Sequence, residues 1–172
     1  MQKKYRFKCA SCDEWHEGIP GWGWNFPIHY HTIPETEREK RCFLNSDLCA
    51  VDNEAFFVCG CLELPVLGST DIMSLRVWVS LSEDNFFAFQ DLLGVTERSQ
   101  NGPYFGWLSV PIPTYPDTMN LKTMVHIRND GIRPFIQLEP SNHPLSLEQQ
   151  HGVGPDRIQA LYNYFEHPRV EG

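Results

Sequence analysis

The sequence lacks the features that would assign it to several common classes of protein. No run of Lys and Arg is longer than the pairs Lys3-Lys4 and Lys40-Arg41, so the chain has no basic stripe that would neutralise nucleic-acid phosphates. The longest near-continuous apolar stretch, residues 55–62, is far shorter than the ~20 residues of a membrane-spanning helix. An apolar signal region is also missing after Met1. We therefore expect a soluble, cytoplasmic protein that binds neither nucleic acid nor membrane.

Cysteine is too sparse for a fold built on disulfides. Six cysteines among 172 residues do not make a disulfide-dense secreted scaffold, and a chain of this length can bury roughly 70% of its unfolded surface without cross-links. With 41% hydrophobic and 21% charged residues, the composition excludes disorder, collagen and coiled coil for the chain as a whole. Asp and Glu number 22 against 14 Lys and Arg, a net charge of −8, which favours a partner protein with a basic surface.

The order of the predicted elements indicates an α+β fold. The Gly-, Pro- and aromatic-rich residues 5–33 are predicted to be irregular, and the charged segment 34–42 is typical of a short surface helix. Strands are predicted at 48–51, 55–64, 75–81, 104–110, 121–127 and 134–138, and helices at 83–93, 146–150 and 155–166. The turn at residues 128–131 is a strong hairpin signal, because Asp130-Gly131 tolerates positive φ.

These elements predict a single domain, residues 1–172, with a mostly antiparallel sheet and a few short helices packed on it. We expect the helices at 83–93 and 155–166 to cover one face of that sheet. The segment 1–33 is expected to carry a Cys-containing knuckle and to pack, stapled by any zinc, on an α+β core of residues 34–172.

Several motifs follow one another in an order typical of one family. They are Phe7-x-Cys9-x-x-Cys12, Ser46-Asp47-Leu48-Cys49, Phe56-Phe57-x-x-Gly60-Cys61-x-Glu63-x-Pro65, Val77-Trp78-Val79-Ser80-Leu81, Phe105-Gly106-Trp107-Leu108 and Leu138-Glu139-Pro140-x-x-His143-Pro144-Leu145-x-x-Glu148-Gln149. From about residue 7 to residue 168 the chain resembles the bacterial family called domain of unknown function 2199. The resemblance implies no activity, because none is established for that family. Two positions depart from the family's pattern, with Asp13 in place of glycine and Cys59 in place of arginine.

The pair Cys9 and Cys12 is the sharpest chemical signal. A C-x-x-C turn brings two thiolates within reach of one tetrahedral zinc ion at ~2.3 Å, and the aromatic residues on both sides resemble a zinc knuckle. Candidates for two further ligands are His16, Cys49, Cys61 and, ranked after them, Cys59. Zinc bound in this way would tie the N-terminal segment to the sheet. The alternatives are a reduced pair without metal and a redox pair, which is disfavoured because no βαβ pattern follows it.

A second group of polar residues is suited to acid–base chemistry. Its members are His126, Glu139, His143 and Glu148. A carboxylate near an imidazole at a strand-to-helix turn can transfer a proton, yet no nucleophile motif, phosphate loop or H-E-x-x-H sequence accompanies them. His143 also precedes Pro144, a position where a side chain commonly caps a helix. His29 and His31 could face one side of a strand, but two ligands do not make a metal site.

The sequence is compatible with two classes of function, an interaction domain and an enzyme. We favour an acidic interaction domain that binds another macromolecule and in which any zinc is structural, because no complete catalytic constellation is present. The alternative is an enzyme of unrecognised type that uses the region of His126, Glu139 and His143, which requires a polar pocket converging on these groups. A redox or metal sensor would instead require Cys9 and Cys12 to be exposed and reversibly oxidised.

Overall fold

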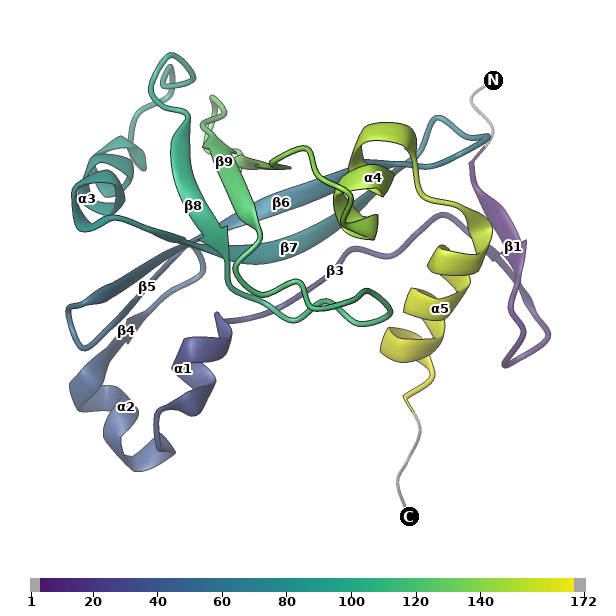
Figure 1. Cartoon of the computed structure of the whole chain (residues 1–172), viewed down its shortest axis with the longest axis horizontal. Coiled ribbons are helices and arrows are strands. Elements are labelled where there is room, and N and C mark those ends of the chain that lie inside the picture. The colour runs from purple at the N-terminus through teal and green to yellow at the C-terminus, as the bar shows by residue number, and fades with distance from the viewer. Residues whose placement is uncertain (1–3, 169–172) are drawn as a thin grey trace.

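The computed structural model describes residues 4–168, in which ten strands form two sheets accompanied by five short helices (Figure 1). The strands are β1 (Arg6–Lys8), β2 (Trp15–Glu17), β3 (Trp22–Gly23), β4 (Cys42–Leu44), β5 (Leu48–Val51), β6 (Ala55–Pro65), β7 (Ile72–Leu81), β8 (Tyr104–Leu108), β9 (Lys122–His126) and β10 (Phe135–Leu138). The helices are α1 (Ile28–Thr32), α2 (Glu35–Arg41), α3 (Glu83–Leu92), α4 (Pro144–His151) and α5 (Pro155–Glu166). Strands β1 and β2 form a separate two-stranded sheet.

Five strands of the main sheet close into a barrel, so the prediction of a mostly antiparallel open sheet is wrong. Strands β7, β8, β9, β10 and β6 follow one another around the ring, and β6 pairs with β7 again. The joint between β10 and β6 is parallel, with Phe135 opposite Cys61, whereas the other four pairs of the ring are antiparallel. The barrel is therefore mixed, and β3, β4 and β5 extend the sheet beyond it.

Two glycines allow the ring to close. Gly60 lies in β6 beside β10, and a Cβ atom at this position would stand 2.5 Å from the Cδ1 atom of Ile136. Gly106 lies in β8 beside β7, and a Cβ atom there would stand 2.4 Å from the carbonyl oxygen of Ser80. Glycine inside a strand often marks such a close approach. Both positions fit ordinary strands in the sequence, so the closure was not predicted.

The side chain of Gln149, from α4, completes the joint between β10 and β6. Only the pair Phe135 and Cys61 is in register between these strands, and beyond it the Gln149 amide takes the place of a neighbouring strand. Its Oε1 accepts the Leu138 N–H at 2.8 Å, and its Nε2 donates to the Ile136 carbonyl at 2.9 Å. Because Ile136 is 0% and Leu138 is 4% exposed, these backbone groups would otherwise be buried without partners.

Alternate residues of the barrel strands form one part of the core. Val58 and Leu62 of β6, Leu75 and Val77 of β7 and Ile136 of β10 are fully buried, which follows from the two-residue period of side-chain direction in a strand.

The turn between β9 and β10 has the predicted geometry, since Asp130 and Gly131 have φ of 61° and 70°. No helix within residues 4–168 has the length and apolar character needed to cross a membrane.

The helices α3 and α5 occur where they were predicted, but they do not share one face. Figure 1 shows them at opposite ends of the molecule. Helix α3 begins at Ser82, whose Oγ accepts the Asn85 N–H, and it packs on β6. Helix α5 instead contacts the N-terminal segment, where Trp22 stacks on Phe165 with ring centroids 5.2 Å apart.

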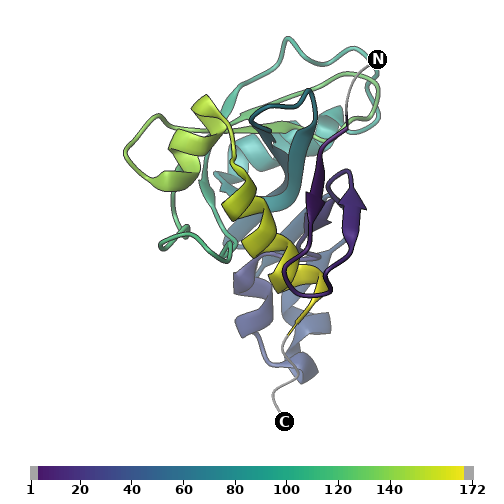
Figure 2. The same cartoon turned by 90° about the vertical axis from the view of Figure 1, so that its right-hand side faces the viewer.

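The N-terminal segment is more regular than predicted. It contains the β1–β2 hairpin, β3 and α1. Strands of two or three residues are too short to show an alternating pattern in the sequence, so the segment was predicted to be irregular. Figure 2 shows the β1–β2 hairpin lying beside α5, and this arrangement brings the first cysteines to the far end of the chain.

Candidate metal centre

Four side chains form a cluster between the β1–β2 hairpin and the end of α5. They are Cys9, Cys12, His16 and His167, and their possible ligand atoms all lie within 4.8 Å of one another. The Cys12 sulfur is 3.2 Å from His16 Nε2, and the Cys9 sulfur is 3.5 Å from His167 Nε2. Two thiols and two imidazoles are ligands that soft and borderline metal ions prefer, so this cluster could hold a metal ion.

The hairpin positions three of the four residues. Cys9 directly follows β1 and Cys12 lies in the connecting turn, while His16 stands in β2 opposite Phe7. The turn is closed by backbone hydrogen bonds from Cys9 N–H to Glu14 O and from Asp13 N–H to Cys9 O, at 2.8 and 2.9 Å. Asp13 has φ of 59°, a conformation that favours glycine and that Asp tolerates better than most residues. The position where the family's pattern has glycine therefore keeps the backbone geometry of glycine.

Helix α5 supplies the fourth residue and the supporting hydrogen bonds. His167 follows the last residue of α5, and its backbone N–H bonds to Asn163 O. The Tyr162 hydroxyl lies 3.1 Å from His16 Nδ1, which leaves Nε2 of that imidazole directed at the cluster. Gln159 Nε2 donates to the Cys9 sulfur at 3.7 Å. The edge contact of Phe7 with Tyr162, at 5.0 Å between centroids, holds the helix against the hairpin.

The two thiols differ in acidity. Burial of Cys9 favours its protonated form, but backbone N–H groups of Cys12 and Ser11 together with the Cys12 thiol donate to its sulfur and lower its pKa to about 6. The pKa of Cys12 is raised, since burial and the neighbouring Cys9 sulfur outweigh a hydrogen bond from the Glu14 backbone. A thiolate at Cys9 therefore disfavours ionisation of Cys12, because two like charges at this distance repel each other.

The structure does not bring the other predicted cysteines to this cluster. Cys49 and Cys59 are fully buried in the core on β5 and β6, and burial raises the pKa of each to about 12. Cys61 lies on β6 at the joint with β10. His167 supplies the fourth possible ligand, which was predicted to be a strand cysteine. His167 follows no motif and stands 158 residues from Cys9, so no spacing rule could have found it.

The histidines at positions 29 and 31 also face different surroundings. The His29 ring packs on Phe57 at 4.9 Å, and burial lowers its pKa. The His31 ring stacks on Phe26 at 5.9 Å. Each imidazole therefore has its own aromatic neighbour.

The four acid–base candidates are held by separate partners. His143 caps α4 by accepting the Leu145 N–H at its Nδ1, while its Nε2 lies 3.0 Å from the Asp117 carbonyl. His126 Nε2 is 2.8 Å from Gln137 Oε1. Glu148 accepts hydrogen bonds from the Tyr115 hydroxyl and from Arg157 Nε. The cap at His143 was predicted from its place before Pro144, as the alternative to catalysis.

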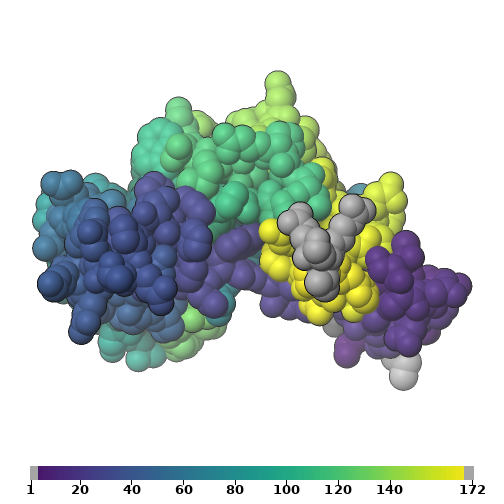
Figure 3. Space-filling view, turned by 90° about the horizontal axis from the view of Figure 1, so that it is seen from below, coloured from purple at the N-terminus to yellow at the C-terminus, as the bar shows by residue number. Residues whose placement is uncertain are grey.

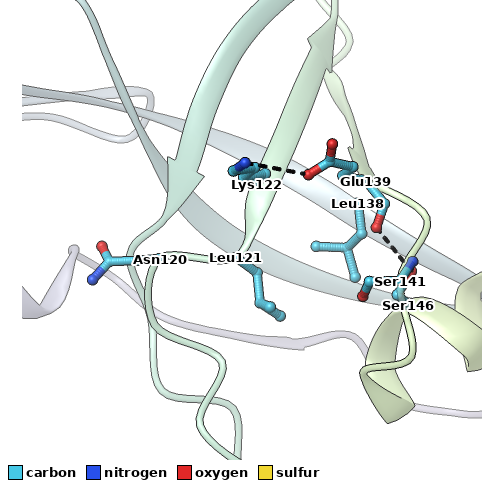
Figure 4. Close-up of a pocket in the computed structure, with 7 residues that line it drawn as sticks. All are labelled: Asn120, Leu121, Lys122, Leu138, Glu139, Ser141 and Ser146. Carbon is cyan, nitrogen blue, oxygen red and sulfur yellow. Dashed lines mark hydrogen bonds and ion pairs between the residues drawn. The ribbon is translucent and has the colours of Figure 1, made fainter.

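Glu139 is the one member of this group that lines a cavity of about 210 Å³ between β9, β10 and α4 (Figure 4). Its carboxylate lies 4.0 Å from Lys122 Nζ, and its backbone carbonyl accepts the Ser146 hydroxyl. The residues around this cavity are Asn120, Leu121, Lys122, Leu138, Glu139, Ser141 and Ser146. None of the three other acid–base candidates is among them, so this cavity does not bring the predicted group together.

The comparisons with known proteins assign a family but no activity. No curated protein and no solved structure matches the chain. A family described as "Uncharacterized protein conserved in bacteria (DUF2199)" matches residues 8–153, which include Cys9, Cys12 and His16 and end before His167. The match confirms the resemblance drawn from the motifs. The chain therefore belongs to the DUF2199 family of bacterial proteins.

Proposed function

We propose that this protein is a non-catalytic interaction domain whose fold is completed by one structural Zn²⁺ ion bound to Cys9, Cys12, His16 and His167. The observation that carries the zinc site is the cluster itself. Zn–S bonds of ~2.3 Å and Zn–N bonds of ~2.0–2.1 Å place neighbouring ligands of a tetrahedral site about 3.3–3.8 Å apart. The contacts of 3.2 Å between Cys12 and His16 and of 3.5 Å between Cys9 and His167 lie close to that range.

A set of four protein ligands supports a structural role. Catalytic zinc sites keep a position open for water or substrate, whereas Cys₂His₂ sites are closed. The β1–β2 hairpin consists of two strands of three residues each, and an isolated two-stranded hairpin is marginally stable. Zinc would cross-link this hairpin to α5 and so contribute binding free energy to folding.

The interaction role is supported by the absence of a shared site for the acid–base candidates and by the net charge of −8. His143 and Glu148 are engaged in holding α4 and its neighbours, and neither joins Glu139 at its cavity. Acidic proteins associate rapidly with basic partners because opposite charges steer the encounter.

The metal content of protein purified without chelators tests the zinc site. Native mass spectrometry and elemental analysis should give one zinc per chain, and Cys9→Ser and His167→Ala should each abolish it. Cys61→Ser and His31→Ala are matched controls that should retain the metal. Protein without zinc, zinc retained in Cys9→Ser, or zinc lost in Cys61→Ser would contradict the proposed ligand set.

Hydrogen exchange shows what the metal does to the fold. Removal of zinc by a chelator should speed amide exchange in residues 5–33 and in α5 first and leave β6 and β7 protected, because local units open independently of the core. Uniform loss of protection across the barrel would show that the metal is needed by the whole domain and not by this corner alone.

A further inference from the structure

A row of apolar side chains runs from the end strand of the sheet to α3, with an exposed phenylalanine ring at each end and the buried Ala50 and Phe56 between them. Phe43 on β4 is 52% exposed and Phe87 on α3 is 46% exposed. The register places Phe43 opposite Ala50 of β5, and Ala50 opposite Phe56 of β6. The Phe56 ring in turn contacts Phe87, with centroids 5.8 Å apart. We call Phe43, Ala50, Phe56 and Phe87 the α3–β4 strip.

Carboxylates surround the exposed ring of Phe87. On α3, Glu83 and Asp84 stand four and three residues before Phe87, and Asp91 stands four residues after it. Residues with these spacings share one side of a helix. All three are exposed, and α3 has no Lys or Arg in its sequence. Within residues 4–168 none of the three makes an ion pair. Their charges are therefore available to a partner.

We propose that the α3–β4 strip, with the carboxylates of α3, binds a basic amphipathic segment of another protein. This inference rests on the proposed role of the protein as an interaction domain and names the chemistry of its partner. The two phenylalanine rings offer apolar surface, and the carboxylates around Phe87 match Lys or Arg side chains next to the apolar residues of the partner. A second copy of this chain would bring the same three carboxylates together, so repulsion disfavours self-association through this face.

The strip lies far from the candidate metal centre. Figure 1 places α3, β4 and α2 at one end of the molecule and α5 with the β1–β2 hairpin at the other. Figure 3 shows the same separation between the segment of α2 and β4 and that of α5 with the hairpin. The partner segment therefore contacts neither Cys9 nor His167, and the two proposals can be tested separately on one protein sample.

A synthetic amphipathic peptide of Lys and Leu serves as the probe, with binding measured by calorimetry and by backbone NMR shifts of the zinc-loaded protein. We expect shifts centred on α3 and β4, binding that weakens as salt rises, and no binding of peptides in which Glu replaces Lys or Ser replaces Leu. Phe87→Ser and Phe43→Ser should each weaken binding by about tenfold or more. Phe105→Ser removes a ring of similar exposure, 42%, on β8 and should leave the affinity unchanged.

A matched pair of charge variants separates local from overall charge. One double variant carries Asp84→Asn and Asp91→Asn on α3, and the other carries Glu35→Gln and Glu39→Gln on α2. Each double variant changes the net charge of −8 by +2, to −6. The first pair should weaken peptide binding more than the second. Equal effects of the two pairs, equal effects of Phe87→Ser and Phe105→Ser, or a dimer that Phe87→Ser dissociates would overturn the inference. Protein purified without chelators that contains no zinc but binds the peptide would refute the metal site alone. Zinc-loaded protein that does not bind the peptide would refute the α3–β4 strip alone.

Discussion

Gln149→Leu is the substitution that tests how the barrel is closed. It removes the amide that accepts the Leu138 N–H and donates to the Ile136 carbonyl, at 2.8 and 2.9 Å. Each buried backbone group left without a partner costs about 1–3 kcal/mol, and the apolar contact of Leu offsets about 1 kcal/mol of the total. We therefore expect the free energy of unfolding to fall by about 3 kcal/mol.

Urea denaturation of the zinc-loaded protein measures this loss as a lower midpoint with an unchanged m-value. In a domain of this size the melting temperature should fall by about 6–12 °C. Gln150→Leu is the matched control, since Gln150 is exposed and bonds only within α4 to Ser146. Its effect should stay within about 0.5 kcal/mol. Equal stabilities of the two variants, or unchanged amide exchange at Leu138, would refute the role given to Gln149.

Three further predictions concern the turn, the thiols and the partners. Gly131 has φ of 70° with no atom within 4 Å of an added Cβ, so Gly131→Val should cost about 1–2 kcal/mol through backbone strain alone; an unchanged melting temperature would count against this. The pKa of Cys9 is about 6 in the folded chain against an ordinary 9.0. Between these two pH values the unfolded chain therefore binds more protons than the folded chain, and the stability of zinc-free protein should rise with pH. This contribution to stability is lost as the pH falls through about 6. Thermal melts from pH 6 to 8.5 should show this rise, and Cys9→Ser should lack it; identical pH profiles would disprove the assignment. Finally, the acidic protein should not bind duplex DNA or RNA at physiological salt, and gel-shift binding that weakens steeply with salt would contradict that expectation.

Local patterns in the sequence located the longer elements. The helical spacing of residues 83–93, the alternation along residues 55–64 and the Asp130-Gly131 turn were correct because each depends on neighbouring residues. The closure of the barrel depends instead on contacts distant in sequence. It needs two glycines that admit close neighbours and a glutamine side chain that replaces a strand, and neither produces a periodic signal.

The candidate site shows the same division. The spacing of Cys9 and Cys12, with His16 nearby, was readable because all three lie on one hairpin. Cys49 and Cys61 were attractive as ligands only because thiols bind zinc, whereas strand register places Cys49 on β5 and Cys61 on β6. His167 is brought to the hairpin by the packing of α5 through Tyr162 and Phe165, and sequence spacing contains no information about that packing.

The distance in sequence between the members of the cluster also sets the order in which the molecule can be assembled. Cys9 and His167 lie 158 residues apart, whereas β6 and β7 are consecutive strands that meet over ten residue pairs. Closing a long segment of chain costs more entropy before its contacts form. We therefore expect the cluster to form after the pairing of β6 with β7, and its completion joins residue 9 to residue 167 of a folded chain.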